Sequence, residues 1–192
     1  MARNPSPMQL VWPAAAHLGS YVDALTRGWS ADNVRGEAAA REELERIAID
    51  AAGFLASCVD REAKGAPIEL PDGSYAQRIP GFRRWLWDGE FCGSIGLRWQ
   101  RGTTDLPPHC LGHIGYAVVP WKQGRGYATL ALRDTLPAAR AEGLAFVELT
   151  TDPANIPSRR VIEKNGGVLV ERFVKPPQYG NTEGLRYRIA LE

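Results

Sequence analysis

Two glycines and an arginine stand at the entrance of a predicted helix, in the stretch WKQGRGYATLAL at residues 121–132. Glycine costs a helix about 1 kcal/mol relative to alanine, so Gly124 and Gly126 need a compensating role there. A glycine-rich turn from a strand into a helix leaves the first backbone N–H groups unpaired, and the helix dipole adds positive potential. Glycines also let the main chain approach an anion closely, and Arg125 adds charge at the rim. The stretch therefore predicts a phosphate-binding loop.

Two familiar kinds of phosphate loop fit these residues poorly. A loop for nucleoside triphosphates needs Lys-Ser or Lys-Thr after its second glycine, whereas Tyr127 and Ala128 follow here. A dinucleotide-binding loop needs a third small residue where Thr129 stands, and an acidic residue about 20 positions further on, near which Asp152 lies. Dinucleotide binding stays open as the weaker alternative, and so does a tight turn without a ligand.

Composition limits the classes of ligand and partner. The length of 192 residues suits a single domain over residues 1–192. With 23 basic and 22 acidic residues the net charge is +1, so no global attraction to nucleic acid or an anionic membrane is expected. Cys58, Cys92 and Cys110 have no metal-type spacing, and their odd number argues against a disulfide framework. No apolar run has signal-peptide or membrane-span length, so the sequence predicts a cytoplasmic protein with reduced thiols and no metal.

The front of the chain is predicted to be mainly helical. It begins with a short strand at residues 8–12 and a helix at residues 14–28. A second helix is indicated by apolar residues at helical spacing, which are Leu44, Ile47, Ala48, Ala51, Leu55, Cys58 and Val59. A loop at residues 64–81 separates this helical front from a remainder that is rich in strands.

That remainder opens with a predicted β-hairpin at residues 83–99. Asp88 and Gly89 form its two-residue turn, and apolar residues alternate along its second strand. Ser94 and Arg98 occupy the opposite positions of that strand and are expected to face solvent. Four tryptophans near this hairpin and the glycine loop could line an aromatic pocket, but large aromatics in a hairpin more often form core or a subunit contact, and we expect two of the four to be core residues. The four are Trp85, Trp87, Trp99 and Trp121.

From His113 the predicted order is strand, turn, helix, strand, loop, helix and two further strands. The helix after the glycine loop is stopped by Gly143 and is expected to kink at Pro137. A strand-helix-strand unit inside a hairpin-connected sheet predicts a mixed α/β domain. The elements are expected at residues 113–119, 127–142, 145–151, 158–165, 166–174 and 183–192.

The glycine loop and its surroundings resemble the GNAT superfamily of N-acetyltransferases. Residues 123–128, QGRGYA, match its Q/R-x-x-G-x-G/A signature. The likeness is strongest from Gly112 onward, and the phrases GHIGY and NIPSRRVIEKNGG are similar to those of a group of bacterial predicted acetyltransferases. The resemblance implies the acyl-CoA N-acyltransferase fold, which is a mixed, mostly antiparallel α/β sheet with one splayed parallel strand pair, flanked by helices.

The resemblance also implies acetyl-CoA (coenzyme A) as the cofactor. Backbone groups at the end of the central strand would pair with the pantetheine arm, and the glycine loop would hold the pyrophosphate. Asn155 matches an asparagine that binds the pantetheine arm, although a lone loop asparagine more often caps a helix. The residues with cofactor roles by resemblance are Val118, Val119, Gln123, Gly124, Arg125, Gly126, Tyr127, Ala128, Asn155 and Ser158.

The implied reaction is direct transfer of an acetyl group to a primary amine. An amine like that of lysine has a pKa of about 10.4 in water, so a base has to remove a proton. His113 is the first candidate because the pKa of histidine is normally about 6.5, and Glu148 is the second. Each also has a structural interpretation, as a hydrogen-bonded strand-end histidine and as a salt-bridge residue. A backbone N–H near Val118 or Val119 would stabilise the charge that develops on the carbonyl oxygen.

The sequence departs from the family pattern at one catalytic position. Many relatives carry a tyrosine general acid where this chain has Ile162. Tyr116, Tyr127, Ser158 or solvent would then protonate the leaving thiolate. The missing tyrosine keeps a second function open, that of a non-catalytic acyl-CoA binding or sensor module.

The predicted acceptor is a small-molecule or peptide amine. Neither a basic stripe nor an acidic cluster points to a particular substrate, and neither nucleic acid nor a membrane is an expected partner. In this family the acceptor pocket is built from the front helices, the loop after them and the closing hairpin, here around residues 175–184. The apolar face of the front helices also suits a homodimer.

Overall fold

The structure is a computed structural model that describes residues 7–69 and 73–191. The chain forms two compact units, each built from several segments. Unit 1 takes its residues from the segments 1–59, 82–96 and 116–131, and unit 2 takes the rest. The prediction of a single domain stays a prediction.

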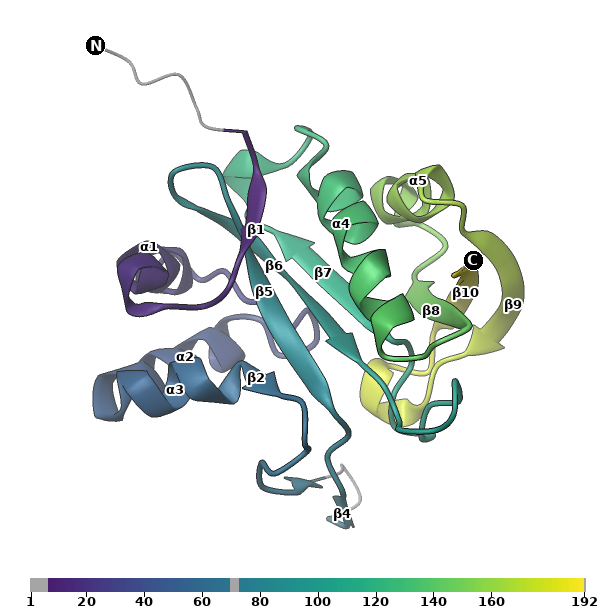
Figure 1. The fold of residues 1–192 in the computed structure, drawn as a ribbon, viewed down its shortest axis with the longest axis horizontal. Coiled ribbons are helices and arrows are strands. Elements are labelled where there is room, and N and C mark those ends of the chain that lie inside the picture. Colours follow the sequence, from purple (N-terminus) through teal and green to yellow (C-terminus); the bar gives the residue numbers. More distant parts are fainter. Residues whose placement is uncertain (1–6, 70–72, 192) are drawn as a thin grey trace. The chain divides into compact units, whose positions relative to one another are not determined.

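Among the described residues, most strands belong to two larger sheets (Figure 1). The larger sheet has the order β1, β5, β6 and β7, with β2 paired to β5, and the smaller has the order β8, β10 and β9. In the smaller sheet β10 runs antiparallel to both neighbours. The strands are β1 (Gln9–Val11), β2 (Val59–Asp60), β5 (Gly81–Trp87), β6 (Phe91–Arg98), β7 (Ile114–Val118), β8 (Phe146–Thr151), β9 (Val168–Val174) and β10 (Glu183–Ala190).

Helices occupy the front of the chain and the connections around β8. They are α1 (Ala15–Thr26), α2 (Glu37–Ile49), α3 (Ala51–Ser57), α4 (Tyr127–Ala141) and α5 (Ile156–Lys164). The predicted strand-turn-helix-strand order after His113 is confirmed, and α4 continues through Pro137 to end shortly before Gly143, whose φ is 83°. Among the described residues, no helix is long and apolar enough to cross a membrane. The mixed α/β fold class is therefore confirmed.

The predicted second helix is wrong in one respect, because it is two helices. The chain breaks at Asp50, between α2 and α3. The Asp50 carboxylate accepts a hydrogen bond from the Gly53 N–H at 2.8 Å and so caps a new helix. As a result the predicted apolar face is interrupted, and Ala48 and Val59 are exposed while Cys58 is buried.

The predicted loop at residues 64–81 contains a small hairpin. Its strands are β3 (Ile68–Glu69) and β4 (Tyr75–Ala76), which pair antiparallel. Residues 70–72 of the predicted loop lie outside the described residues.

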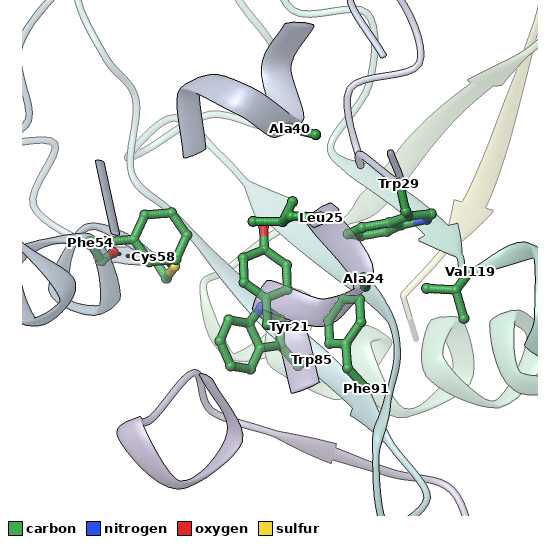
Figure 2. Packing of buried hydrophobic residues seen from close by; sticks show 10 residues of the cluster. All are labelled: Tyr21, Ala24, Leu25, Trp29, Ala40, Phe54, Cys58, Trp85, Phe91 and Val119. Carbon is green, nitrogen blue, oxygen red and sulfur yellow. Dashed lines mark hydrogen bonds between the residues drawn. The ribbon is translucent and has the colours of Figure 1, made fainter. Parts of the chain in front are cut away.

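Aromatic side chains dominate the core of unit 1 (Figure 2). Tyr21 of α1 lies at the centre and stacks on Trp85, with ring centroids 4.6 Å apart. Phe91 meets Tyr21 edge-on at 4.9 Å, and Phe54 of α3 lies 5.8 Å away on another side. Such pairs add about 0.5–1.5 kcal/mol each beyond the area that they bury. The cluster thus ties α1 and α3 to the β5–β6 hairpin, which presents Asp88 at its turn.

The prediction that Ser94 faces solvent is wrong. Ser94 is 3% exposed, and the residues of β6 from Phe91 to Ile95 are all buried. In the sheet order β6 lies between β5 and β7, and a strand covered on both faces loses the polar face that simple alternation predicts. Arg98, at the end of the strand, is exposed as predicted.

A glycine lets β6 approach the end of β7 closely. Gly93 has a φ of 147°, and a Cβ atom there would lie 2.8 Å from the Cα of Val118. Any other residue would push β7 away at the position that leads into the glycine loop. Gly93 therefore fixes the backbone of β7 just before that loop.

Of the four tryptophans, Trp85 and Trp99 are buried, and Trp121 is 37% exposed. Two of the four are therefore core residues, as predicted. All three cysteines are free and buried.

Candidate active site

The predicted phosphate loop is the turn between β7 and α4, in unit 1. A short 3-10 helix, η1 (Pro120–Lys122), follows the buried Val119, and α4 begins at Tyr127. Gly124 and Gly126 have φ angles of 76° and 78°, in the left-handed region that favours glycine. A Cβ atom at either position would meet no heavy atom within 4 Å, so the space beside the loop is open. The glycines therefore serve an unusual backbone conformation next to open space.

The start of α4 supplies the hydrogen-bond donors. The Leu130 N–H donates to the Gly126 carbonyl at 3.1 Å, and the N–H groups of the loop residues before α4 lie outside the hydrogen-bond ladder of the helix. These donors and the helix dipole favour an anion at the loop. Arg125 is exposed at its rim. The residues present fit a diphosphate group.

At the end of β7, the N–H groups of Val118 and Val119 point to opposite edges of the strand. The Val119 N–H donates to the Cys92 carbonyl of β6 at 3.0 Å, so it is not available to a substrate. Successive N–H groups of a strand point to opposite edges, so the Val118 N–H points to the edge of β7 away from β6. Among the residues that the structure describes, β7 is the last strand in the order of its sheet, so no further strand of that sheet pairs with this edge. Of the two predicted oxyanion donors, the geometry favours Val118.

His113 is held as a structural residue of unit 2. It is 1% exposed, and its Nδ1 accepts from the Glu148 N–H at 2.9 Å. The proton therefore resides on Nε2, which lies 2.9 Å from the Thr104 carbonyl and donates to it. Burial lowers the pKa of His113 below its usual value. Neither ring nitrogen is available to a substrate amine, so the geometry supports the structural interpretation of this residue.

His113 also marks the point where β7 and β8 meet. Its N–H donates to the Glu148 carbonyl at 2.8 Å, and a Cβ atom on the preceding Gly112 would lie 2.9 Å from that same oxygen. Beyond this point the two strands belong to separate sheets. The hydrogen bonds between His113 and Glu148 therefore connect β7 and β8 at this point.

The side chain of Glu148 belongs to an ion-pair network in unit 2. It accepts from Arg186 at 3.0 Å and from Arg188 at 2.7 Å. The same three residues, with Phe146, line part of a cavity of about 330 Å³. The salt-bridge interpretation of Glu148 is confirmed, and its carboxylate also lies on the wall of a cavity.

Asn155 caps α5 in unit 2. Its Oδ1 accepts from the Ser158 N–H at 3.1 Å, as expected of a helix cap. Within the part of the chain that the structure describes, its Nδ2 group has no acceptor, so a donor remains for a ligand. The role of both residues toward pantetheine stays a prediction.

The candidate acids differ in their surroundings. Ile162 is 1% exposed inside unit 2, so its position contributes no proton. The Tyr127 hydroxyl donates to the Asp88 carboxylate at 2.7 Å, and burial, aided by that hydrogen bond, raises its pKa. Tyr116 is half-buried on β7. Tyr127 thus anchors the loop, and the role of Tyr116 as an acid stays a prediction.

The structure brings the predicted residues at 118–128 together on one turn of unit 1. His113, Glu148, Asn155 and Ser158 lie in unit 2. Two residues that hold the loop, Asp88 and Lys122, were missed. They lie far apart in the sequence, so no local spacing indicated that they pair.

Comparison with known proteins decides the family. A family model described as an acetyltransferase (GNAT) domain matches residues 50–168, more than half of the chain. The chain belongs to the GNAT acetyltransferase family. This membership confirms the predicted resemblance and favours an acyl-CoA ligand over the dinucleotide alternative. No curated protein matches the sequence significantly.

Solved GNAT acetyltransferases share the fold at low sequence identity. The microcin C7 self-immunity acetyltransferase MccE, in complex with acetyl-CoA and AMP, is 12% identical over 95% of this chain and 92% of its own, with a TM-score of 0.60. RimL, a ribosomal L7/L12 α-N-protein acetyltransferase in complex with coenzyme A, is 11% identical over 98% of both chains, with a TM-score of 0.59. A GNAT-family acetyltransferase from Bacillus anthracis is 17% identical, with a TM-score of 0.58 and coverage of 97% of this chain and 96% of its own. These similarities confirm the fold.

Proposed function

We propose that this GNAT protein is an acetyl-CoA-dependent N-acetyltransferase that acts on the primary amine of a small molecule or peptide. The observation that carries the proposal is the open, positive-φ turn at Gly124 and Gly126, at the N-terminus of α4. The family membership supports it, and so do the complexes of MccE with acetyl-CoA and of RimL with coenzyme A.

Backbone groups of unit 1 bind the cofactor in this proposal. The N–H groups from Gly124 to Ala128 hold the diphosphate, and Arg125 adds charge at the rim. The Val118 carbonyl at the edge of β7, which accepts from the Gln123 side chain at 3.3 Å, pairs with an amide N–H of the pantetheine arm. In unit 2, the Nδ2 group of Asn155 donates to the same arm, with Ser158 beside it.

Bound acetyl-CoA supplies an activated thioester to the incoming amine. The Val118 N–H stabilises the charge that develops on the carbonyl oxygen. Both ring nitrogens of His113 bond to backbone groups, whereas Glu148, although paired with Arg186 and Arg188, lines a cavity of about 330 Å³. We therefore assign the base to Glu148, which receives the proton through water in that cavity. Tyr116 returns a proton to the thiolate.

The direct test measures thiol release from acetyl-CoA across a panel of primary amines, together with coenzyme A binding by calorimetry. Thiol release that depends on an amine, with acetyl-amine product found by mass spectrometry, is the expected result. Failure to bind coenzyme A would contradict the cofactor assignment.

A non-catalytic acyl-CoA sensor is the second candidate function. The observation that favours it is the buried Ile162, at the position of the tyrosine acid of many relatives. Binding of acetyl-CoA without turnover on any amine of the panel would favour the sensor, whereas turnover on one amine would exclude it.

A further inference from the structure

A buried lysine lies immediately before the glycine loop. Lys122 is 7% exposed, and its Nζ donates to both carboxylate oxygens of Asp88 at 3.0 Å and to Glu90 at 2.8 Å. An ammonium group is costly to bury unless it is paired. Here the pairing comes from the turn of the β5–β6 hairpin, which is far from Lys122 in the sequence.

The same carboxylate also holds the residue after the loop. The Tyr127 hydroxyl donates to Oδ2 of Asp88 at 2.7 Å. Asp88 is 4% exposed, and burial alone would raise its pKa, but the hydrogen bonds from Tyr127 and Lys122 outweigh burial and hold the pKa below its usual value. Asp88 is therefore a charged acceptor that Lys122 and Tyr127 share.

These two donors enclose the glycine loop. Lys122 is the last residue of η1, and Tyr127 is the first of α4, so residues 123–126 lie between them. We propose that Asp88 is a positioning residue for the diphosphate loop, holding both of its ends in place so that its N–H groups already point to one anion. This inference rests on the proposed function of the loop.

The charge of the cluster favours positioning over attraction. The Lys122 ammonium group is neutralised by the carboxylates of Asp88 and Glu90, so these three groups carry no net positive charge that would attract an anion. The cluster must therefore contribute to binding by fixing the conformation of the loop. A loop with two glycines has a large conformational freedom, which would have to be lost on binding if nothing held the loop beforehand.

The test compares acetyl-CoA with S-acetylpantetheine, which has the thioester but no diphosphate. In Asp88→Asn we expect the Kd for coenzyme A and the KM for acetyl-CoA to rise about tenfold. Residues that orient a ligand-binding group without touching the ligand have effects of about this size. The kcat/KM for S-acetylpantetheine should stay within about twofold of wild type, because that donor does not use the loop.

A matched control exists in the same unit. Glu43 accepts from the Tyr21 hydroxyl and from Arg83 at 3.0 Å, so it too is a carboxylate shared by a tyrosine and a cation. Glu43→Gln disturbs a cluster of the same chemistry away from the loop and should leave the Kd for coenzyme A unchanged. Equal losses in Asp88→Asn and Glu43→Gln, or equal losses for both acetyl donors, would overturn the proposal.

A second readout does not depend on the ligand. Amide hydrogen exchange at Gln123 and Leu130, whose N–H groups are hydrogen-bonded to the Pro120 and Gly126 carbonyls on either side of the loop, should be faster in Asp88→Asn than in wild type, and Tyr127→Phe should show a smaller change. If Asp88→Asn does not fold, Tyr127→Phe carries both measurements. Unchanged exchange in these variants would overturn the positioning role. If wild type does not bind coenzyme A, the proposed function fails, while the exchange result still decides the role of Asp88.

Discussion

The glycine loop of unit 1 and the His113 junction of unit 2 use their polar groups in opposite ways. At the loop, the side chains of Lys122 and Tyr127 bond to Asp88, while the backbone at Gly124 and Gly126 lies beside open space. At the junction, both ring nitrogens of His113 have backbone partners. A ligand therefore finds donors at the loop and none at the histidine, although histidine is the more reactive residue type. The region whose donors lie beside open space is therefore the one that can bind a ligand.

The largest expected effect comes from a negative charge in the loop. In Gly126→Asp the new carboxylate would lie near the diphosphate, and two unit charges about 4 Å apart repel by about 4 kcal/mol at an effective dielectric constant of about 20. We expect the affinity for coenzyme A to fall roughly a thousandfold, as measured by calorimetry.

Gly126→Ala is the control for this variant. It carries the same strain at a φ of 78° but adds no charge, and its methyl group meets open space. The strain costs about 1–2 kcal/mol of folding stability, and binding should be far less affected than in Gly126→Asp. Similar affinities in wild type and Gly126→Asp would show that the diphosphate does not bind at this turn.

The next largest effect is expected at the His113 junction, where a substitution should lower the free energy of unfolding and leave the catalytic mechanism unchanged. His113→Ala leaves the Glu148 N–H and the Thr104 carbonyl unpaired, at a cost of about 1–3 kcal/mol for each buried group. Urea unfolding should show this loss, while the pH dependence of kcat/KM should keep its shape in the variant. Loss of the acidic limb of that profile would instead make His113 the base.

The pH dependence of folding tests the same histidine. The pKa of His113 is lowered in the folded state, so below about pH 6.5, the usual value for histidine, the unfolded chain binds a proton that the folded chain does not. The contribution of His113 to stability is therefore complete above that pH and declines as the pH falls toward the folded-state pKa. His113→Ala should lack this decline in urea unfolding between pH 7 and pH 5. A decline equal to that of wild type would assign it to other groups.

Local patterns were sufficient for much of the fold around the loop. The glycines at 124 and 126 and the stop at Gly143 can be recognised from neighbouring residues, and so can the β5–β6 hairpin, although its turn has three residues (88–90) and not the predicted two. Most of what failed depends on distant partners. Ser94 is buried because other elements cover β6. Asp50 is the exception, because its carboxylate caps α3 through the Gly53 N–H only three residues further on, which is a local signal that the apolar spacing concealed. By contrast, the engaged state of His113 depends on Thr104 and Glu148, which no spacing rule connects to it.

The smallest expected effect is a change in thiol reactivity, which reports on the two regions separately. Burial, reinforced by the neighbouring Asp88 carboxylate, raises the pKa of Cys92 to about 12, and burial also raises the pKa values of Cys58 and Cys110. A thiol reacts as its thiolate, so the native protein should react very slowly with a disulfide reagent at pH 8, whereas the unfolded chain should expose all 3 thiols.

In Asp88→Asn the cluster beside Cys92 is weakened, so peptide mapping should find faster modification of Cys92 and an unchanged rate at Cys110. His113→Ala should give the converse, because it loosens the junction in the unit that contains Cys110. Equal acceleration at both cysteines in either variant would mean that the two regions open together, and the contrast between a locally held loop and a locally held histidine would then be lost.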